Sequence, residues 1–215
     1  MDDAPGRDCP RCPRLATWRG ALRLDHPDWH NAPVPSFGPL SARLLIVGLA
    51  PGLRGANRTG RPFTGDYAGD LLYATLAKFG LANGDYLARA DDGLRLGQVR
   101  ITNAVRCVPP ENKPLPDEIT ACRGFLLQEL ARLQELRVIL ALGQIAHQQV
   151  GAVLGVKRKE FGFRHGVLAT ISRGDNRPPL ITAASYHCSR YNTNTGRLTP
   201  AMFEAVFDLL MPYLE

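Results

Sequence analysis

Residues 43–48 of this chain of 215 residues read Arg43-Leu44-Leu45-Ile46-Val47-Gly48. A short apolar run that ends in glycine is typical of a strand buried on both faces of a parallel sheet. Outward from it, further strands are expected at 99–105, 138–143, 167–172 and 180–184, and helices at 66–79, 116–135, 144–153 and 200–214. Strands that alternate with helices predict a three-layer α/β/α sandwich with a central, mainly parallel sheet.

Residues 1–40 contain a Cys-x-x-Cys, both tryptophans and many prolines, with little periodicity. They predict an irregular, cysteine-bearing arm wrapped over the core. A chain of 215 residues fits one domain, so we expect residues 1–215 to form a single domain that includes the arm.

No apolar run approaches the roughly 18 residues that a membrane span needs. The opening Met1-Asp2-Asp3-Ala4-Pro5 also lacks the basic-then-apolar order of a secretory signal. We therefore expect no membrane association and a reducing compartment, where structural disulfides are rare.

The formal charge of +6 is unevenly distributed. Residues 145–200 hold eight basic and two acidic residues, so the rest of the chain is close to neutral. A one-sided excess of this kind suits a polyanion such as nucleic acid, although an ordinary solvated surface would also explain it.

Four of the five cysteines form two pairs. Cys9 and Cys12 make the Cys-x-x-Cys, and Cys107 and Cys122 bracket the loop between a predicted strand and the next helix. Two such pairs predict one four-thiolate metal site, which either zinc or an iron–sulfur cluster could occupy.

A Cys2His2 zinc finger is the competing interpretation of the same region, with His26 and His30 as the other ligands. Pro27 lies between those histidines and would break the helix that must carry them. This interpretation also leaves Cys107 and Cys122 without a role.

The loop at 48–66 follows the first strand, where active sites of parallel sheets lie. It matches neither a P-loop nor a dinucleotide fingerprint, but its glycines let backbone approach a ligand and its arginines could face phosphate. Phe63 lies on this polar loop and suits stacking on a planar base, although it could instead pack onto the core.

Two other strand ends carry polar side chains that suit a base. Asn103 offers both a donor and an acceptor, as reading a base edge requires. His187 lies just beyond the last apolar strand, where a functional histidine is expected. Cys188 follows it, but neighbouring side chains on an extended chain point in opposite directions, so we do not expect Cys188 to be catalytic.

Taken together, these residues resemble the uracil-DNA glycosylase superfamily. The motifs that carry the resemblance are Gly48-x-Ala50-Pro51-Gly52, Gly60-Arg61-Pro62-Phe63-Thr64-Gly65-Asp66, the strand-end Asn103 and Tyr186-His187-x-Ser189. The cysteine pairs narrow it to the iron–sulfur branches, families 4 and 5. Leu49 replaces the family 4 glutamate, Ala50 stands where other branches place an aspartate, and Cys188 replaces a proline, all of which match family 5, the B type.

The resemblance runs from Cys9 to about Thr199 and implies an enzyme of DNA base-excision repair. Such an enzyme flips a deaminated base, uracil and also hypoxanthine, out of DNA and hydrolyses its N-glycosidic bond. It further implies a [4Fe-4S] cluster in place of zinc, a monomer, and a bacterial or archaeal cytoplasm with the enzyme on nucleoid DNA.

The resemblance also assigns roles to residues. His187 would donate to the base oxygen, Phe63 would stack on the base, Asn103 would contact its edge, and Ala50 and Gly52 would complete the substrate site. Position in the chain, and not the resemblance, predicts the DNA contacts. Arg58 and Arg61 lie in the loop after the first strand, and Arg190 and Tyr191 lie in the loop that could fill the gap left by the flipped base.

Leu49 and Ala50 leave the first motif without its usual acid. Asp66 is the predicted replacement as a catalytic residue, with Asp70 one helical turn later in reserve. Asp66 could alternatively be only a helix N-cap.

Two other functions fit part of the pattern: a non-catalytic, metal-stabilised nucleic-acid-binding protein, and a nucleosidase-like hydrolase of free nucleosides. The basic excess at 145–200 disfavours the nucleosidase.

Overall fold

The computed structural model describes residues 4–173 and 177–215. Its main sheet has the strand order β4-β1-β5-β7-β6. The strands are β1 (Leu44–Gly48), β4 (Val99–Asn103), β5 (Val138–Leu142), β6 (Leu168–Ile171) and β7 (Leu180–Ser185). All neighbours pair in parallel except β6, which runs antiparallel to β7 at the edge.

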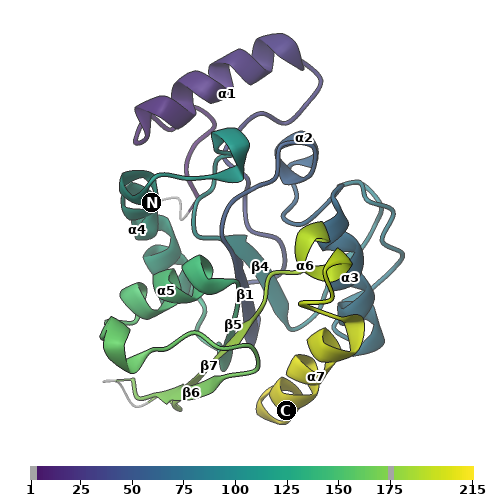
Figure 1. Ribbon diagram of the computed structural model, residues 1–215, viewed down its shortest axis with the longest axis vertical. Coiled ribbons are helices and arrows are strands. Elements are labelled where there is room, and N and C mark those ends of the chain that lie inside the picture. The colour runs from purple at the N-terminus through teal and green to yellow at the C-terminus, as the bar shows by residue number, and fades with distance from the viewer. Residues whose placement is uncertain (1–3, 174–176) are drawn as a thin grey trace.

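Helices cover both faces of this sheet (Figure 1). The side chains of β1 alternate between two cores, because successive residues of a strand point to opposite faces. Leu44 and Ile46 pack with α3 (Tyr67–Lys78) and α7 (Pro200–Leu210), and Leu45 and Val47 pack with α4 (Pro116–Arg132) and α5 (Gln144–Val153). The predicted α/β/α sandwich with a mainly parallel sheet is confirmed.

The remaining elements are short. They are α2 (Ala56–Thr59), α6 (Arg190–Asn194), the hairpin β2 (Ala82–Asn83) and β3 (Arg95–Leu96), and the 3-10 turns η1 (Pro110–Asn112), η2 (Arg158–Glu160) and η3 (Met211–Tyr213). In the described part of the chain, no helix has both the length and the apolar character that crossing a bilayer requires.

The prediction of an irregular arm at 1–40 is wrong for its middle, where α1 (Pro13–Asp25) forms a regular helix. Its buried face is Leu15, Arg19 and Leu22, at the i, i+4, i+7 spacing of a helix. The arginine at the centre of that face hides the apolar periodicity. Arg19 is buried because it donates to the Cys9 carbonyl (3.0 Å) and to Cys107 Sγ (3.5 Å).

A buried ion network fixes the segment after β4. Glu129 on α4 accepts from Arg100 (2.6 Å) and from Arg106 (2.5 Å), and Arg106 also donates to Ser36 (2.7 Å). Removing one partner from such a network leaves an uncompensated buried charge, which costs about 3–5 kcal/mol. The network therefore holds the segment between β4 and α4 in one place.

Candidate active site and cysteine site

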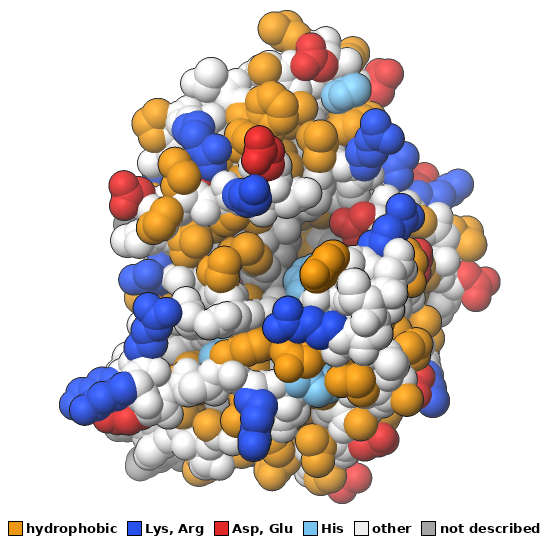
Figure 2. Space-filling model, viewed as in Figure 1, with side chains coloured by type: hydrophobic (Ala, Val, Ile, Leu, Met, Phe, Trp, Pro, Cys, Tyr) orange, Lys and Arg blue, Asp and Glu red, His pale blue; other side chains and the backbone are white. Residues whose placement is uncertain are grey.

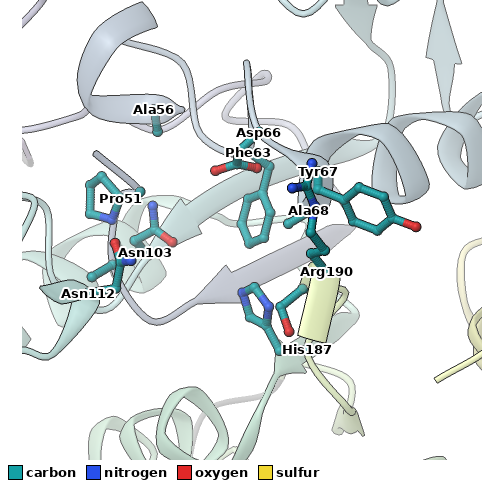
Figure 3. A pocket seen from close by; sticks show the side chains of 13 residues that line it. Pro51, Ala56, Phe63, Asp66, Tyr67, Ala68, Asn103, Asn112, His187 and Arg190 are labelled. Carbon is teal, nitrogen blue, oxygen red and sulfur yellow. The ribbon is translucent and has the colours of Figure 1, made fainter. Parts of the chain in front are cut away.

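A cavity of about 290 Å³ opens at the carboxyl ends of β1, β4 and β7 (Figure 3). The predicted catalytic and substrate-binding residues all line it, together with Arg190, although they come from segments far apart in the chain. These lining residues are Ala50, Gly52, Phe63, Asp66, Asn103, His187 and Arg190. Figure 2 shows the hollow near the centre of one face of the molecule.

The ring of Phe63 forms one wall of this pocket, opposite the imidazole of His187, with ring centroids 5.8 Å apart. Phe63 has a φ of 52°, in the left-handed region that non-glycine residues rarely adopt and that the surrounding structure must enforce. A Cβ on Gly48, at the end of β1, would lie 2.6 Å from Phe63 Cζ and would collide with Asn103 Oδ1. The glycine that ends β1 therefore makes room for both residues.

Arg61 enforces the conformation of the Phe63 loop. Its guanidinium bonds both oxygens of Asp92 (2.6 and 2.7 Å) and donates to Thr64 Oγ1 (2.7 Å). The Tyr73 hydroxyl donates to the Pro62 carbonyl (2.7 Å) in the same loop. Arg61 also holds the pKa of the Asp92 carboxyl well below its usual range.

The prediction that Arg61 contacts DNA is therefore corrected. Its side chain is only 5% exposed and its charge is matched by Asp92, so it cannot reach a phosphate. Sequence spacing gave no sign of this, because the two partners lie far apart in the chain.

Asp66 has one carboxylate oxygen for the helix and another for the pocket. Oδ1 accepts from the Gly69 amide (3.3 Å) as the N-cap of α3. Oδ2 faces the loop after β1, where a Cβ on Gly52 would lie 2.9 Å from it and one on Gly55 would collide with it. Burial raises the pKa of this carboxyl. The reserve candidate, Asp70, is exposed and does not line the pocket.

His187 points into the pocket from the end of β7 (Figure 3). Its backbone is fixed because Asn192 Nδ2 donates to its carbonyl (2.8 Å). Burial lowers the pKa of the imidazole to about 4, so the ring is neutral near pH 7 and one nitrogen carries a proton to donate. Cys188 points the other way into the core, where burial raises its pKa to about 12.

Asn103 is buried at the end of β4 and pairs in register with Gly48. Asn112, which sequence analysis missed, also lines the pocket, on the same side as Asn103 in Figure 3. Asn112 has a φ of 58° at the end of η1, and asparagine tolerates that left-handed conformation better than most residues. An asparagine in a proline-rich loop was the only available signal.

The predicted DNA-contacting residues differ in their place relative to the pocket. Residues 190–194, predicted as loop, form α6. Its Arg190 lines the pocket with the guanidinium over the Tyr67 ring (5.4 Å), while Tyr191 is 72% exposed. Arg58 is exposed on α2 and does not line the pocket.

Cys9, Cys12, Cys107 and Cys122 surround a second, small cavity between α1, α4 and the segment after β4. Leu15, Ile119 and Phe125 enclose it. Burial raises the pKa of the Cys12 thiol to about 11 and that of Cys107 to about 12. Hydrogen-bond donors nonetheless reach two of the sulfurs: Arg19 bonds Cys107 Sγ, and the Arg106 amide bonds Cys122 Sγ (3.4 Å).

This donor set fits a thiolate-bound metal group, because N–H donors offset the negative charge that coordinated sulfur carries. Over residues 4–173 and 177–215, no three His, Cys, Asp or Glu side chains are arranged to hold a single metal ion. His26 stacks on Trp29 (3.9 Å) and His30 bonds the Pro33 carbonyl (3.2 Å), so neither histidine joins the cysteines.

Comparisons with known proteins identify the family of the chain. The sequence model of the uracil DNA glycosylase superfamily matches residues 35–211. A type-5 uracil-DNA glycosylase of Thermus thermophilus is 47% identical over 201 residues, which cover 91% of this chain and 89% of the relative. One of Mycobacterium leprae is 44% identical, covering 93% and 88%. A type-4 uracil-DNA glycosylase of Pyrobaculum aerophilum is 34% identical, covering 73% and 66%.

Proposed function

The chain belongs to the type-5 uracil-DNA glycosylases of the uracil DNA glycosylase superfamily, and we propose that it excises uracil from DNA with the pocket at the carboxyl ends of β1, β4 and β7. It is a DNA-repair hydrolase that acts on N-glycosyl bonds. The single observation that carries the site assignment is the meeting of Phe63, Asn103 and His187 in one pocket.

Cleavage leaves the departing base with the bonding electron pair and the sugar with positive charge. The neutral His187 imidazole suits an N–H donor to the base oxygen, where negative charge develops, because preorganised donors of this kind stabilise such charge strongly. Asn103 holds the base edge and Phe63 packs against the base plane.

Asp66 supplies the negative group near the sugar. Its Oδ2 stabilises the cationic sugar and accepts a proton from the water that adds to the anomeric carbon. Two glycines, Gly52 and Gly55, keep the space in which this oxygen sits. The helix cap and the catalytic role are compatible, since they use different oxygens of one carboxylate.

Hypoxanthine is the second base that we assign to the pocket. Ala50 lines the cavity with only a methyl group, which leaves space for the larger purine. Release of hypoxanthine from inosine-containing DNA at a rate near that of uracil would support this, and release of uracil alone would contradict it.

Tyr191 and Arg190 are proposed to fill the gap that the extruded nucleotide leaves in the duplex. Tyr191 is exposed and directly follows Arg190, which lines the pocket, and this supports Tyr191 as the inserting residue. The other proposed DNA contact is Arg58, which we place on backbone phosphate.

The four cysteines are proposed to hold a [4Fe-4S] cluster. A cluster binds each thiolate at a separate iron, which suits sulfurs that surround a cavity but do not gather around one point. When bound, the cluster ties α1 to α4 and to the segment after β4, and it takes no part in bond cleavage. Absorbance near about 400 nm with iron and sulfide would support it, and a colourless zinc protein would overturn it.

We further infer that residues 1–215 act as one single-domain monomer on nucleoid DNA. The exposed large apolar residues, such as Leu24, Leu87 and Leu127, come from separate elements, which supports a protein without a large permanent interface. The relatives are bacterial and archaeal.

Detection of the released base distinguishes this function from the two alternative functions. Incubation with uracil-containing DNA should release free uracil, whereas incubation with deoxyuridine should not. Binding without release would indicate a non-catalytic nucleic-acid-binding protein, and release from deoxyuridine would indicate a nucleosidase.

A further inference from the structure

The loop after β1 has a second face that the base pocket does not use. Ala50, Gly52 and Ala56 face the pocket, whereas Leu53, Arg54 and Arg58 line a separate groove of about 280 Å³. The opposite wall of this groove is His26 and Trp29, directly after α1. One loop therefore separates the base pocket from the groove.

The two walls of the groove are locked together by buried polar groups. Asn57 Nδ2 donates to Asn31 Oδ1 (2.9 Å), and Asn31 Nδ2 donates to the His26 backbone carbonyl (2.7 Å). The backbone N–H of Asn31 also donates to the backbone carbonyl of Asn57 (3.2 Å). Both asparagine side chains are buried. Buried, fully paired polar groups rigidify their surroundings, so the groove is a preformed feature.

The chemistry of the lining suits a nucleotide strand. Arg54 and Arg58 are both exposed, and within the described residues neither forms an ion pair. The His26 and Trp29 rings stack at 3.9 Å with planes 10° apart, which holds the indole in a fixed orientation. Free guanidiniums beside an aromatic platform are the combination that binds single-stranded nucleic acid.

The groove and the pocket lie on either side of the loop after β1. Figure 2 shows Lys and Arg side chains between the central hollow and the top of the molecule, where Figure 1 places α1 and α2. A strand whose nucleotide is extruded into the pocket continues past the rim, and the loop after β1 is part of that rim.

We propose that this groove is a second DNA-binding site, for the lesion-bearing strand beyond the extruded nucleotide. Arg54 and Arg58 pair with phosphates, and Trp29 packs against an unpaired nucleotide. The proposal deepens the proposed function and rests on it, since it requires that DNA is the substrate.

The test compares Arg54→Ala/Arg58→Ala with a matched double variant, Arg95→Ala/Lys159→Ala, which removes equal charge from exposed residues that line neither cavity. The probe is a duplex with 2′-fluoro-deoxyuridine, which resists cleavage. Each lost phosphate contact lowers the slope of log K against log salt by about 0.9, so the groove variant should lose about 1.8 and the control none. At low salt its Kd should rise at least tenfold.

Trp29 gives a second readout, because the chain has only two tryptophans. In a Trp18→Phe background, a uracil-free single-stranded oligonucleotide should quench Trp29 fluorescence, and Arg54→Ala/Arg58→Ala should weaken that quenching. Equal salt slopes for the two double variants, or no quenching, would overturn the proposal while uracil release by the wild type stands. If the wild type released no uracil, the proposed function itself would fail.

Discussion

The base pocket and the cysteine site both use the segment that begins at β4, but they treat polar groups in opposite ways. In the pocket, the Asp66 carboxylate and the His187 imidazole line the cavity. At the cysteine site, Arg19 and the Arg106 amide already bond the sulfurs of Cys107 and Cys122, inside an apolar enclosure. Polar groups left open are available to a substrate, whereas enclosed and bonded ones hold a structure together.

The base pocket and the cysteine site are also close to each other in the sequence. Asn103 ends β4 in the pocket and Cys107 follows shortly after it at the cysteine site, with the buried Arg106 between them. The cysteine site therefore fixes the position of one wall of the pocket. Changes at scaffold residues should lower the free energy of unfolding, and changes at pocket residues should lower the rate.

The largest expected effect is a loss of stability when Arg61, a scaffold residue within the pocket loop, is replaced. Arg61→Ala leaves Asp92 buried without its partner, which should lower the free energy of unfolding by about 3–5 kcal/mol in chemical denaturation. The exposed Arg58→Ala is the matched control, with a change within about 0.5 kcal/mol. An Arg61→Ala protein as stable as the wild type would return Arg61 to the DNA-contacting residues.

His187→Ala removes the proposed donor to the base oxygen. Loss of one such donor costs about 10²–10³ in rate, so single-turnover uracil release should fall by that factor with little change in stability. Cys188→Ala serves as the neighbouring control, since its side chain is outside the pocket, and its rate should stay near wild type. A fall of less than tenfold in His187→Ala would remove the donor role.

The pH dependence of the rate follows from the same two residues. Because the pKa of His187 is lowered to about 4, its titration should add no inflection near pH 6.5. The pKa of Asp66 is raised, so protonation of its carboxylate should reduce the rate on the acid side, above the ordinary titration range of an aspartate. Single-turnover rates between pH 4 and 8 check both, and an inflection near 6.5 that His187→Gln abolishes would contradict the neutral imidazole.

The smallest effect concerns the rim. Tyr191→Ala should slow release from paired uracil a few-fold more than release from mismatched uracil, because a mismatched base costs less to extrude. The comparison of Arg190→Ala with Tyr191→Ala then shows which residue fills the gap. Equal loss on both substrates in both variants would rule out insertion by either.

The sheet could be predicted because its strands carry their own signal. The run at 44–48 is apolar throughout, and burial on both faces requires that pattern. The helix α1 could not be predicted, because Arg19 occupies the centre of its buried face. Arg19 is buried there because it donates to the Cys9 carbonyl and to Cys107 Sγ.

Within the pocket, residues at strand ends were predictable and their tertiary partners were not. Asn103 and His187 follow apolar runs, so topology alone brings them to one edge of the sheet. Arg61 looked like a phosphate contact because nothing near it in the chain reveals Asp92. Asn112 was missed because its place depends on the backbone of η1.

The most direct test of the division between pocket and scaffold is the single-turnover rate of uracil release by Asp66→Asn, with its free energy of unfolding measured alongside. Asparagine caps a helix about as well as aspartate, so α3 keeps its N-cap and only the negative charge is lost. We expect unchanged stability and a rate at least about 10²-fold lower. A loss below tenfold, about 1.4 kcal/mol, would contradict the account and leave Asp66 as a helix cap alone.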